Sequence, residues 1–130
     1  SVNEAVLTGL TEEVANRVRA DSQRQIEEDF RVSHAGPVRD LKKVIEDFTD
    51  AMRNAERLHL TQFDKLRDEA KRVKNLNFLD LPEIDEVVRL AADAAALPIG
   101  IPTRDERVAI AAKADKAISK ADETLAALGL

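Results

Sequence analysis

The sequence predicts an all-α protein, with two helical hairpins arranged as a four-helix bundle-like fold around a long second helix. Helix-favouring residues dominate the 130-residue chain, which has no Trp, no Tyr and only four Phe, so the aromatic residues that favour strands are nearly missing. Apolar residues recur at a spacing near 3.6 through most of the chain. The length fits a single domain, residues 1–130.

The first helix is expected over residues 2–33, with a break near residues 9–11 where Gly9 occurs. Ser1 and Glu4 have the spacing of a capping box at its start. One apolar stripe runs along this segment: Leu10, Val14, Val18, Ile26 and Phe30, ending near Val32. Ser22 occupies the step between Val18 and Ile26. This pattern predicts an amphipathic helix with one face to bury.

Residues 33–37, Ser-His-Ala-Gly-Pro, are typical of a helix stop followed by a helix start. Glycine accepts the left-handed conformation after a helix, and proline suits the first turn of the next one. Because the connection is short, we expect the first and second helices to be antiparallel neighbours. His34 is then an exposed residue of the turn.

The second helix is expected over residues 37–76, which contain no Gly or Pro after Pro37. At 1.5 Å per residue this helix would reach roughly 58 Å. Its apolar residues repeat every eleven positions better than every seven, which favours a nearly straight helix or a weak right-handed coil. A polar step at His59 and Thr61 marks the place for a bend. The candidate interaction seam is formed by Leu41, Phe48, Met52, Ala55, Phe63, Leu66 and Val73.

Two shorter helices are expected over residues 82–97 and 103–128. Pro82 suits a first helical turn, with Asp80 and Glu83 as a capping pair around it. Thr103 and Glu106 form the clearest capping box of the chain. The alanines of both helices allow close approach of their backbones and bury little apolar area, so these helices need the long helix or another chain to complete a core.

The residue types of catalytic and cofactor sites are scarce. The four glycines are scattered singly, which disfavours a phosphate-binding loop. The chain has no Cys and only two His, so thiolate chemistry and a cysteine-ligated zinc are excluded. Glu56 and His59 have the Glu-x-x-His spacing of di-iron bundles, but the second such pair is missing, and a polar layer in the long helix explains them better. We expect no enzyme, no metal and no cofactor.

A nucleic-acid contact is the first alternative. The segment of residues 38–76 carries ten basic and eight acidic residues, although the whole chain has a net charge of −5. Acidic residues interrupt the basic ones at ion-pairing spacings, and no Tyr or Trp can stack on bases. The candidate nucleic-acid face is formed by Arg53, Arg57, Arg67, Lys71 and Lys74.

These patterns predict a non-catalytic interaction or assembly module that self-associates or docks on a protein partner through the candidate interaction seam. The alternatives are a nucleic-acid-associated regulatory protein and a ligand-sensing four-helix bundle, although no small-molecule site is predicted. No stretch has the roughly 18 to 20 apolar residues of a membrane span, and the cytoplasm is the default location. The chain begins without Met, which suggests a piece of a longer protein.

Overall fold

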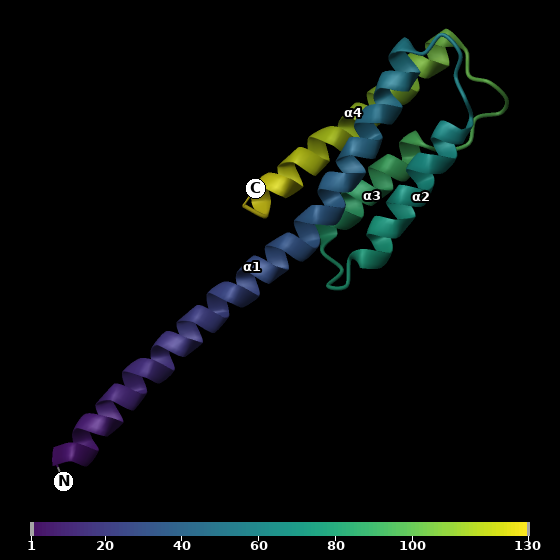
Figure 1. Ribbon diagram of the computed structural model, residues 1–130. Helices are drawn as coiled ribbons and strands as arrows, with labels where there is room; N and C mark the ends of the chain where they lie inside the picture. The colour runs from purple at the N-terminus through teal and green to yellow at the C-terminus, as the bar shows by residue number, and fades with distance from the viewer. Residues whose placement is uncertain (1, 130) are drawn as a thin grey trace. The chain divides into compact units, whose positions relative to one another are not determined.

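The computed structural model describes the backbone of residues 2–129 and the side chains of residues 9 and 11–129. These residues form four α-helices and no strand: α1 (Val2–Asn54), α2 (Thr61–Leu76), α3 (Pro82–Ala94) and α4 (Arg104–Ala127) (Figure 1). The all-α, bundle-like fold class is therefore confirmed. Where the sequence predicted one domain, the chain divides into two compact units, residues 1–33 and 34–130.

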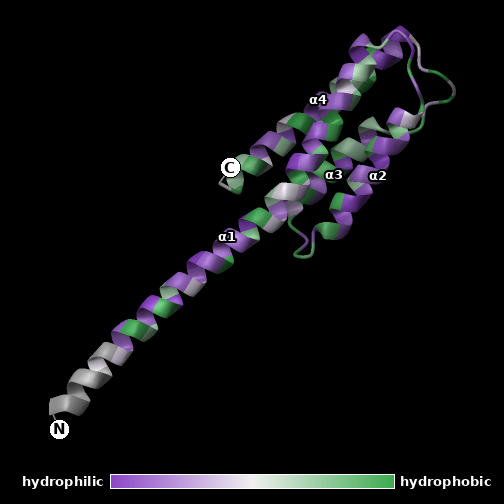
Figure 2. Ribbon diagram, in the orientation of Figure 1, coloured by the Kyte–Doolittle hydropathy of each residue, from purple (hydrophilic) through white to green (hydrophobic). Residues whose placement is uncertain are grey.

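The first unit is helical over residues 2–33, as part of α1. The predicted break at residues 9–11 is absent, and the predicted cap at Ser1 lies outside the described residues. Within residues 11–33 every side chain is exposed except those of Ala15 and Phe30, which are partly buried. Bands of apolar residues alternate with polar ones along this helix (Figure 2).

The predicted stop between the first two helices is wrong, because α1 continues through Gly36 and Pro37. Proline lacks the N–H that would bind the carbonyl of Ser33, so the helix loses one hydrogen bond there. Ala35 and Val38, on either side of the Gly-Pro pair, are fully buried, and their burial offsets that loss. His34, predicted to be exposed in a turn, is a buried helical residue with 6% exposure.

The predicted single helix over residues 37–76 is also wrong, because this segment contains the end of α1, a loop and all of α2. α1 ends at Asn54, residues 55–60 form a loop, and α2 begins at Thr61. The rings of Phe48 in α1 and Phe63 in α2 meet edge to face, with centroids 5.2 Å apart. The interruption falls at the polar step around His59, where a bend was expected.

Arg107 of α4 helps to end α1 at this point. Its Nε donates to the carbonyl of Met52 at 2.8 Å, and its Nη2 donates to the carbonyls of Ala51 and Ala55 at 2.8 and 2.7 Å. These carbonyls lie in the last turn of α1 or just beyond it, where intrahelical partners run out. The carbonyl of Ala51 also accepts from the N–H of Ala55 at 3.1 Å, so the guanidinium replaces the donors of a longer helix at Met52 and Ala55.

The last two helices match their predicted starts more closely than their ends. The capping box of Thr103 and Glu106 is confirmed, with both hydrogen bonds at 3.2 Å. Pro82 lies in the first turn of α3 as predicted, but this helix ends at Ala94 instead of residue 97. The predicted Asp80 and Glu83 cap is wrong, because the N-cap is Leu81 and forms no side-chain cap bond.

Asn77 closes the turn between α2 and α3 in place of that cap. Its Oδ1 accepts from the backbone N–H of Leu81 at 3.0 Å. Its Nδ2 donates to the carbonyl of Leu81 at 3.1 Å and to Oδ1 of Asp85 at 2.9 Å. A single buried amide thus fixes the direction in which the chain enters α3.

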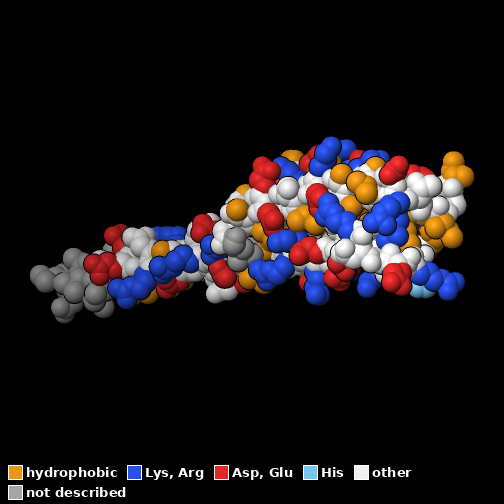
Figure 3. Space-filling view, turned by 90° about the horizontal axis from the view of Figure 1, so that it is seen from above, with side chains coloured by type: hydrophobic (Ala, Val, Ile, Leu, Met, Phe, Trp, Pro, Cys, Tyr) orange, Lys and Arg blue, Asp and Glu red, His pale blue; other side chains and the backbone are white. Residues whose placement is uncertain are grey.

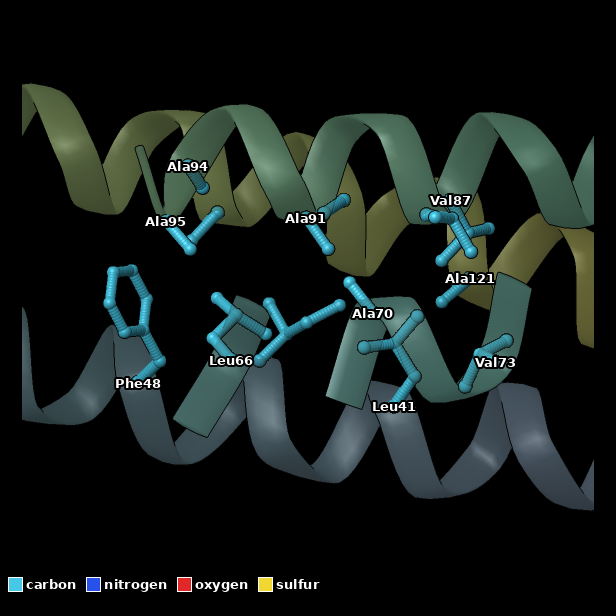
Figure 4. Packing of buried hydrophobic residues seen from close by; sticks show 14 of the residues in the cluster. Leu41, Phe48, Leu66, Ala70, Val73, Val87, Ala91, Ala94, Ala95 and Ala121 are labelled. Carbon is cyan, nitrogen blue, oxygen red and sulfur yellow. The ribbon is translucent and has the colours of Figure 1, made fainter. Parts of the chain in front are cut away.

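The core of the second unit lies among residues 34–54 of α1, α2, α3 and α4 (Figure 4). Large side chains come from α1 and α2, where Leu41, Phe48, Phe63 and Leu66 are almost fully buried. α4 contributes small ones, and its core alanines are completely buried: Ala111, Ala114, Ala117 and Ala121. Small residues on α4 let neighbouring helices approach closely.

Candidate functional site

The candidate interaction seam lies in the core of the second unit. Of its seven residues, Ala55 is partly buried and the other six are buried. Leu41, Phe48, Leu66 and Val73 point into the space between the helices in Figure 4. Because these side chains already pack against the chain's own helices, they have no surface left for a partner. An interaction surface has to lie elsewhere.

Among the described residues, a regular set of apolar side chains lies along the first unit and is here called the N-terminal apolar stripe: Val14, Val18, Ile26 and Val32, which are exposed, and Phe30, which is partly buried. Val14 is 55% exposed, Val18 57%, Ile26 61% and Val32 63%. At 100° per residue these five positions lie within about 160° of the helix circumference, an arc that also holds the exposed polar residues Arg19, Gln25 and Asp29. Ile26 and Phe30 also border a hollow of about 400 Å³ on the surface of this helix.

The other half of this helix is covered by short-range polar contacts. Arg24 pairs with Asp21 and Arg31 with Glu28, each three residues apart, and Gln23 donates to Glu27 at 3.3 Å. Such exposed pairs each stabilise a helix by only a few tenths of a kcal/mol. Because amphipathic helices gain most of their stability from packing, the exposed apolar residues of this helix are a candidate interaction surface.

The candidate nucleic-acid face is divided among three elements. Arg53 lies on α1 and pairs with Asp115 of α4, with Nη1 and Oδ1 3.1 Å apart. This hydrogen bond lowers the pKa of Asp115 below its usual value. Arg57 is an exposed residue of the loop at 55–60. Arg67, Lys71 and Lys74 share one face of α2, and only these three lie together.

A groove of about 720 Å³ runs between α2 and α3, here called the α2–α3 groove. Its α2 wall is formed by Arg67, Lys71, Lys74 and Asn75. Its α3 wall includes Asp85, Arg89 and Ala92, and Asp80 of the connecting turn lies at one end. No sequence pattern indicates a role for Arg89, because only the packing of the two helices brings it opposite the basic residues of α2.

Ion pairs occupy the two arginines of this groove. Arg67 pairs with Asp64 and donates to the carbonyl of Ala95 at 3.0 Å, and Arg89 pairs with Glu86 and Asp93. Lys71 and Lys74 are exposed and form no ion pair within the described part of the chain. Much of the remaining surface mixes the two signs of charge, as one face shows (Figure 3).

Glu56 and His59 do not form the polar layer that the sequence predicted inside a helix. Both residues are exposed in the loop at 55–60. Among the described residues, no group of three or more His, Cys, Asp or Glu side chains could hold a metal ion. In the same part of the chain, no helix combines the length and the apolar character that crossing a bilayer requires.

A further exposed apolar group was not foreseen as a surface. It lies in the connection between α3 and α4 and consists of Leu97, Ile99 and Ile101, which are 69%, 106% and 73% exposed.

Comparison with protein-family models, with curated proteins and with solved structures found no match to this chain. The candidate surfaces therefore rest on the packing and chemistry of this chain alone.

Proposed function

We propose that this chain is a non-catalytic assembly module that self-associates through the N-terminal apolar stripe. The exposure of Val14, Val18, Ile26 and Val32, at 55–63% each, is the observation that supports this most strongly. A stripe of exposed apolar residues along a helix is typical of a helix that pairs with another one. The proposal keeps the predicted class of function and moves its surface from the core residues to the first unit.

A second copy is a partner that the charges of this segment permit. Residues 11–33 contain six acidic and four basic side chains, and acidic and basic groups are interspersed along the helix. Two copies therefore approach one another without a large repulsion between like charges. The bend at Asn54 leaves the predicted seam inside each copy, so association through the stripe leaves that core intact.

Sedimentation velocity over a range of concentrations tests this proposal. The unsubstituted chain is expected to associate, and the double variant Val18→Glu with Ile26→Glu is expected to associate at least about tenfold more weakly. Glutamate has a better helix propensity than valine or isoleucine, so the variant removes the apolar surface without weakening the helix.

The matched control is Asn16→Glu with Ala20→Glu. It changes the net charge by the same amount, and each position lies 200° around the helix from Val18. This control is expected to associate like the unsubstituted chain. A chain that stays monomeric at every concentration, or equal weakening by both double variants, would contradict self-association through the stripe.

A further inference from the structure

The α2–α3 groove combines a positively charged wall with an apolar floor. Lys71 and Lys74 lie one turn apart on α2, and both ammonium groups are exposed without an ion-pair partner in the described part of the chain. Ala70 and Val88 beneath them are 2% and 8% exposed. Alanine at positions 70 and 92 leaves the space between the two helices unfilled, which creates the hollow.

The acidic groups near this groove leave the two lysines available. Asp85 accepts the hydrogen bond from Asn77, so its carboxylate is held at the turn. Arg67 pairs with Asp64, and Arg89 pairs with Glu86 and Asp93 along the two helices. The groove is lined by four basic and two acidic side chains, and Lys71 and Lys74 are its basic residues without an ion pair in the described part of the chain.

We propose that the α2–α3 groove binds an acidic amphipathic helix of a partner protein. The groove follows α2 from Arg67 to Asn75, about 12 Å at 1.5 Å per residue, which fits two to three turns of helix. Apolar side chains of the partner lie on Ala70, Val88 and Ala92, while its carboxylates meet Lys71 and Lys74. This is the helix-in-groove form of recognition, and complementary charge supplies its specificity.

A nucleic-acid backbone fits this groove less well than a peptide does. A phosphate backbone presents no apolar side chain for the floor of the groove. The chain also has no Tyr or Trp to stack on bases. This proposal concerns residues 67–92 and does not depend on self-association through residues 14–32.

Fluorescence anisotropy with the full chain tests the proposal. The probe is a fluorescent three-turn helical peptide with Leu on one face and Glu on both flanks, and its partner probe has Lys in place of every Glu. The acidic peptide is expected to bind about tenfold or more tightly than the basic one, and its binding should weaken as salt concentration rises. Equal binding of both peptides, or no binding of the acidic one, overturns the proposal.

Substitutions test whether the acidic peptide binds in the α2–α3 groove. Lys71→Glu with Lys74→Glu is expected to weaken binding of the acidic peptide about tenfold or more. The control, Lys113→Glu with Lys116→Glu, has the same spacing and charge change on exposed positions of α4, and is expected to leave binding unchanged. Ala92→Gln fills the exposed part of the floor without changing the charge, and is expected to weaken binding too.

Two results would overturn the proposal that the α2–α3 groove binds an acidic peptide. If a 20-nucleotide RNA or DNA bound and the Lys71→Glu with Lys74→Glu variant abolished it while the acidic peptide did not bind, the groove would be a phosphate-binding surface. If peptide-induced changes in amide NMR shifts fell outside residues 67–92, the peptide would bind elsewhere. Unchanged sedimentation in the groove variants separates this proposal from the self-association of the first unit.

Discussion

Arg107 shows how one residue can determine where a distant helix ends. It lies in the first turn of α4, where the partial positive charge of the helix end disfavours a basic side chain. Its three hydrogen bonds to the carbonyls of Ala51, Met52 and Ala55 explain its presence there. No local pattern could have indicated this role, because the donor and its acceptors lie more than fifty residues apart.

Arg107→Gln is therefore expected to lower the free energy of unfolding by about 1.5–3 kcal/mol, since charged donors to partly buried carbonyls are lost. Urea unfolding followed by circular dichroism measures the change. Arg104→Gln is the control, because Arg104 is exposed and lies in the same turn of α4, and it is expected to change stability by less than about 0.5 kcal/mol. Equal effects of the two substitutions would show that the carbonyl contacts contribute nothing.

At the scale of the elements, α4 illustrates packing through small side chains. Ala111, Ala114, Ala117 and Ala121 have no exposed surface and recur at three- and four-residue spacing along one face. Around them, Lys42 and Arg53 of α1 pair with Asp122 and Asp115 of α4. These pairs are partly exposed, so the close packing of the alanines provides more of the stability than the charges do.

Ala114→Leu is expected to destabilise the protein by about 1–3 kcal/mol, because the added carbons have no space between the helices. Ala112→Leu is the matched control at an exposed position of the same helix, where the expected change is below about 0.5 kcal/mol. Thermal or urea unfolding of both variants measures the difference. A tolerated leucine at position 114 would mean that α4 packs less tightly than its complete burial of alanine indicates.

The types of element were easier to predict from the sequence than their limits. Helical periodicity identified every helical region, and the Thr103 and Glu106 cap gave the start of α4 within one residue. Gly36 and Pro37 led to the wrong prediction of a helix end, because α1 continues through both residues while their neighbours Ala35 and Val38 are buried. The end of α1 at Asn54 has no Gly or Pro nearby and depends on contacts with α4 and α2.

The interaction surface was harder to predict than the helices, because it also depends on tertiary contacts. An apolar stripe has the same pattern whether it packs inside the chain or outside it. The strongest stripe, through Leu41, Phe48 and Phe63, turned out to form the core of the second unit. The weaker one, through Val14, Val18 and Ile26, is exposed. Only the reversal at residues 55–60 separates the two cases, and that reversal is a tertiary effect.

For the whole molecule, we propose different roles for the two units. Residues 34–130 contain a core that is completed within one chain, whereas residues 14–32 carry the surface through which we propose that chains associate. The apolar residues in these two segments should therefore respond differently to protein concentration. Core positions should be protected by folding alone, and positions on the N-terminal apolar stripe should be protected only when a second copy binds.

Amide hydrogen exchange, followed residue by residue by NMR at two protein concentrations about a hundredfold apart, tests this most directly. We expect slow exchange at Leu41, Phe48, Phe63 and Leu66 at both concentrations. Exchange across residues 14–32 should slow markedly only at the higher concentration. Concentration-dependent protection at residues 41–73, together with unchanged exchange at residues 14–32, would contradict the account and return the interaction surface to the core helices.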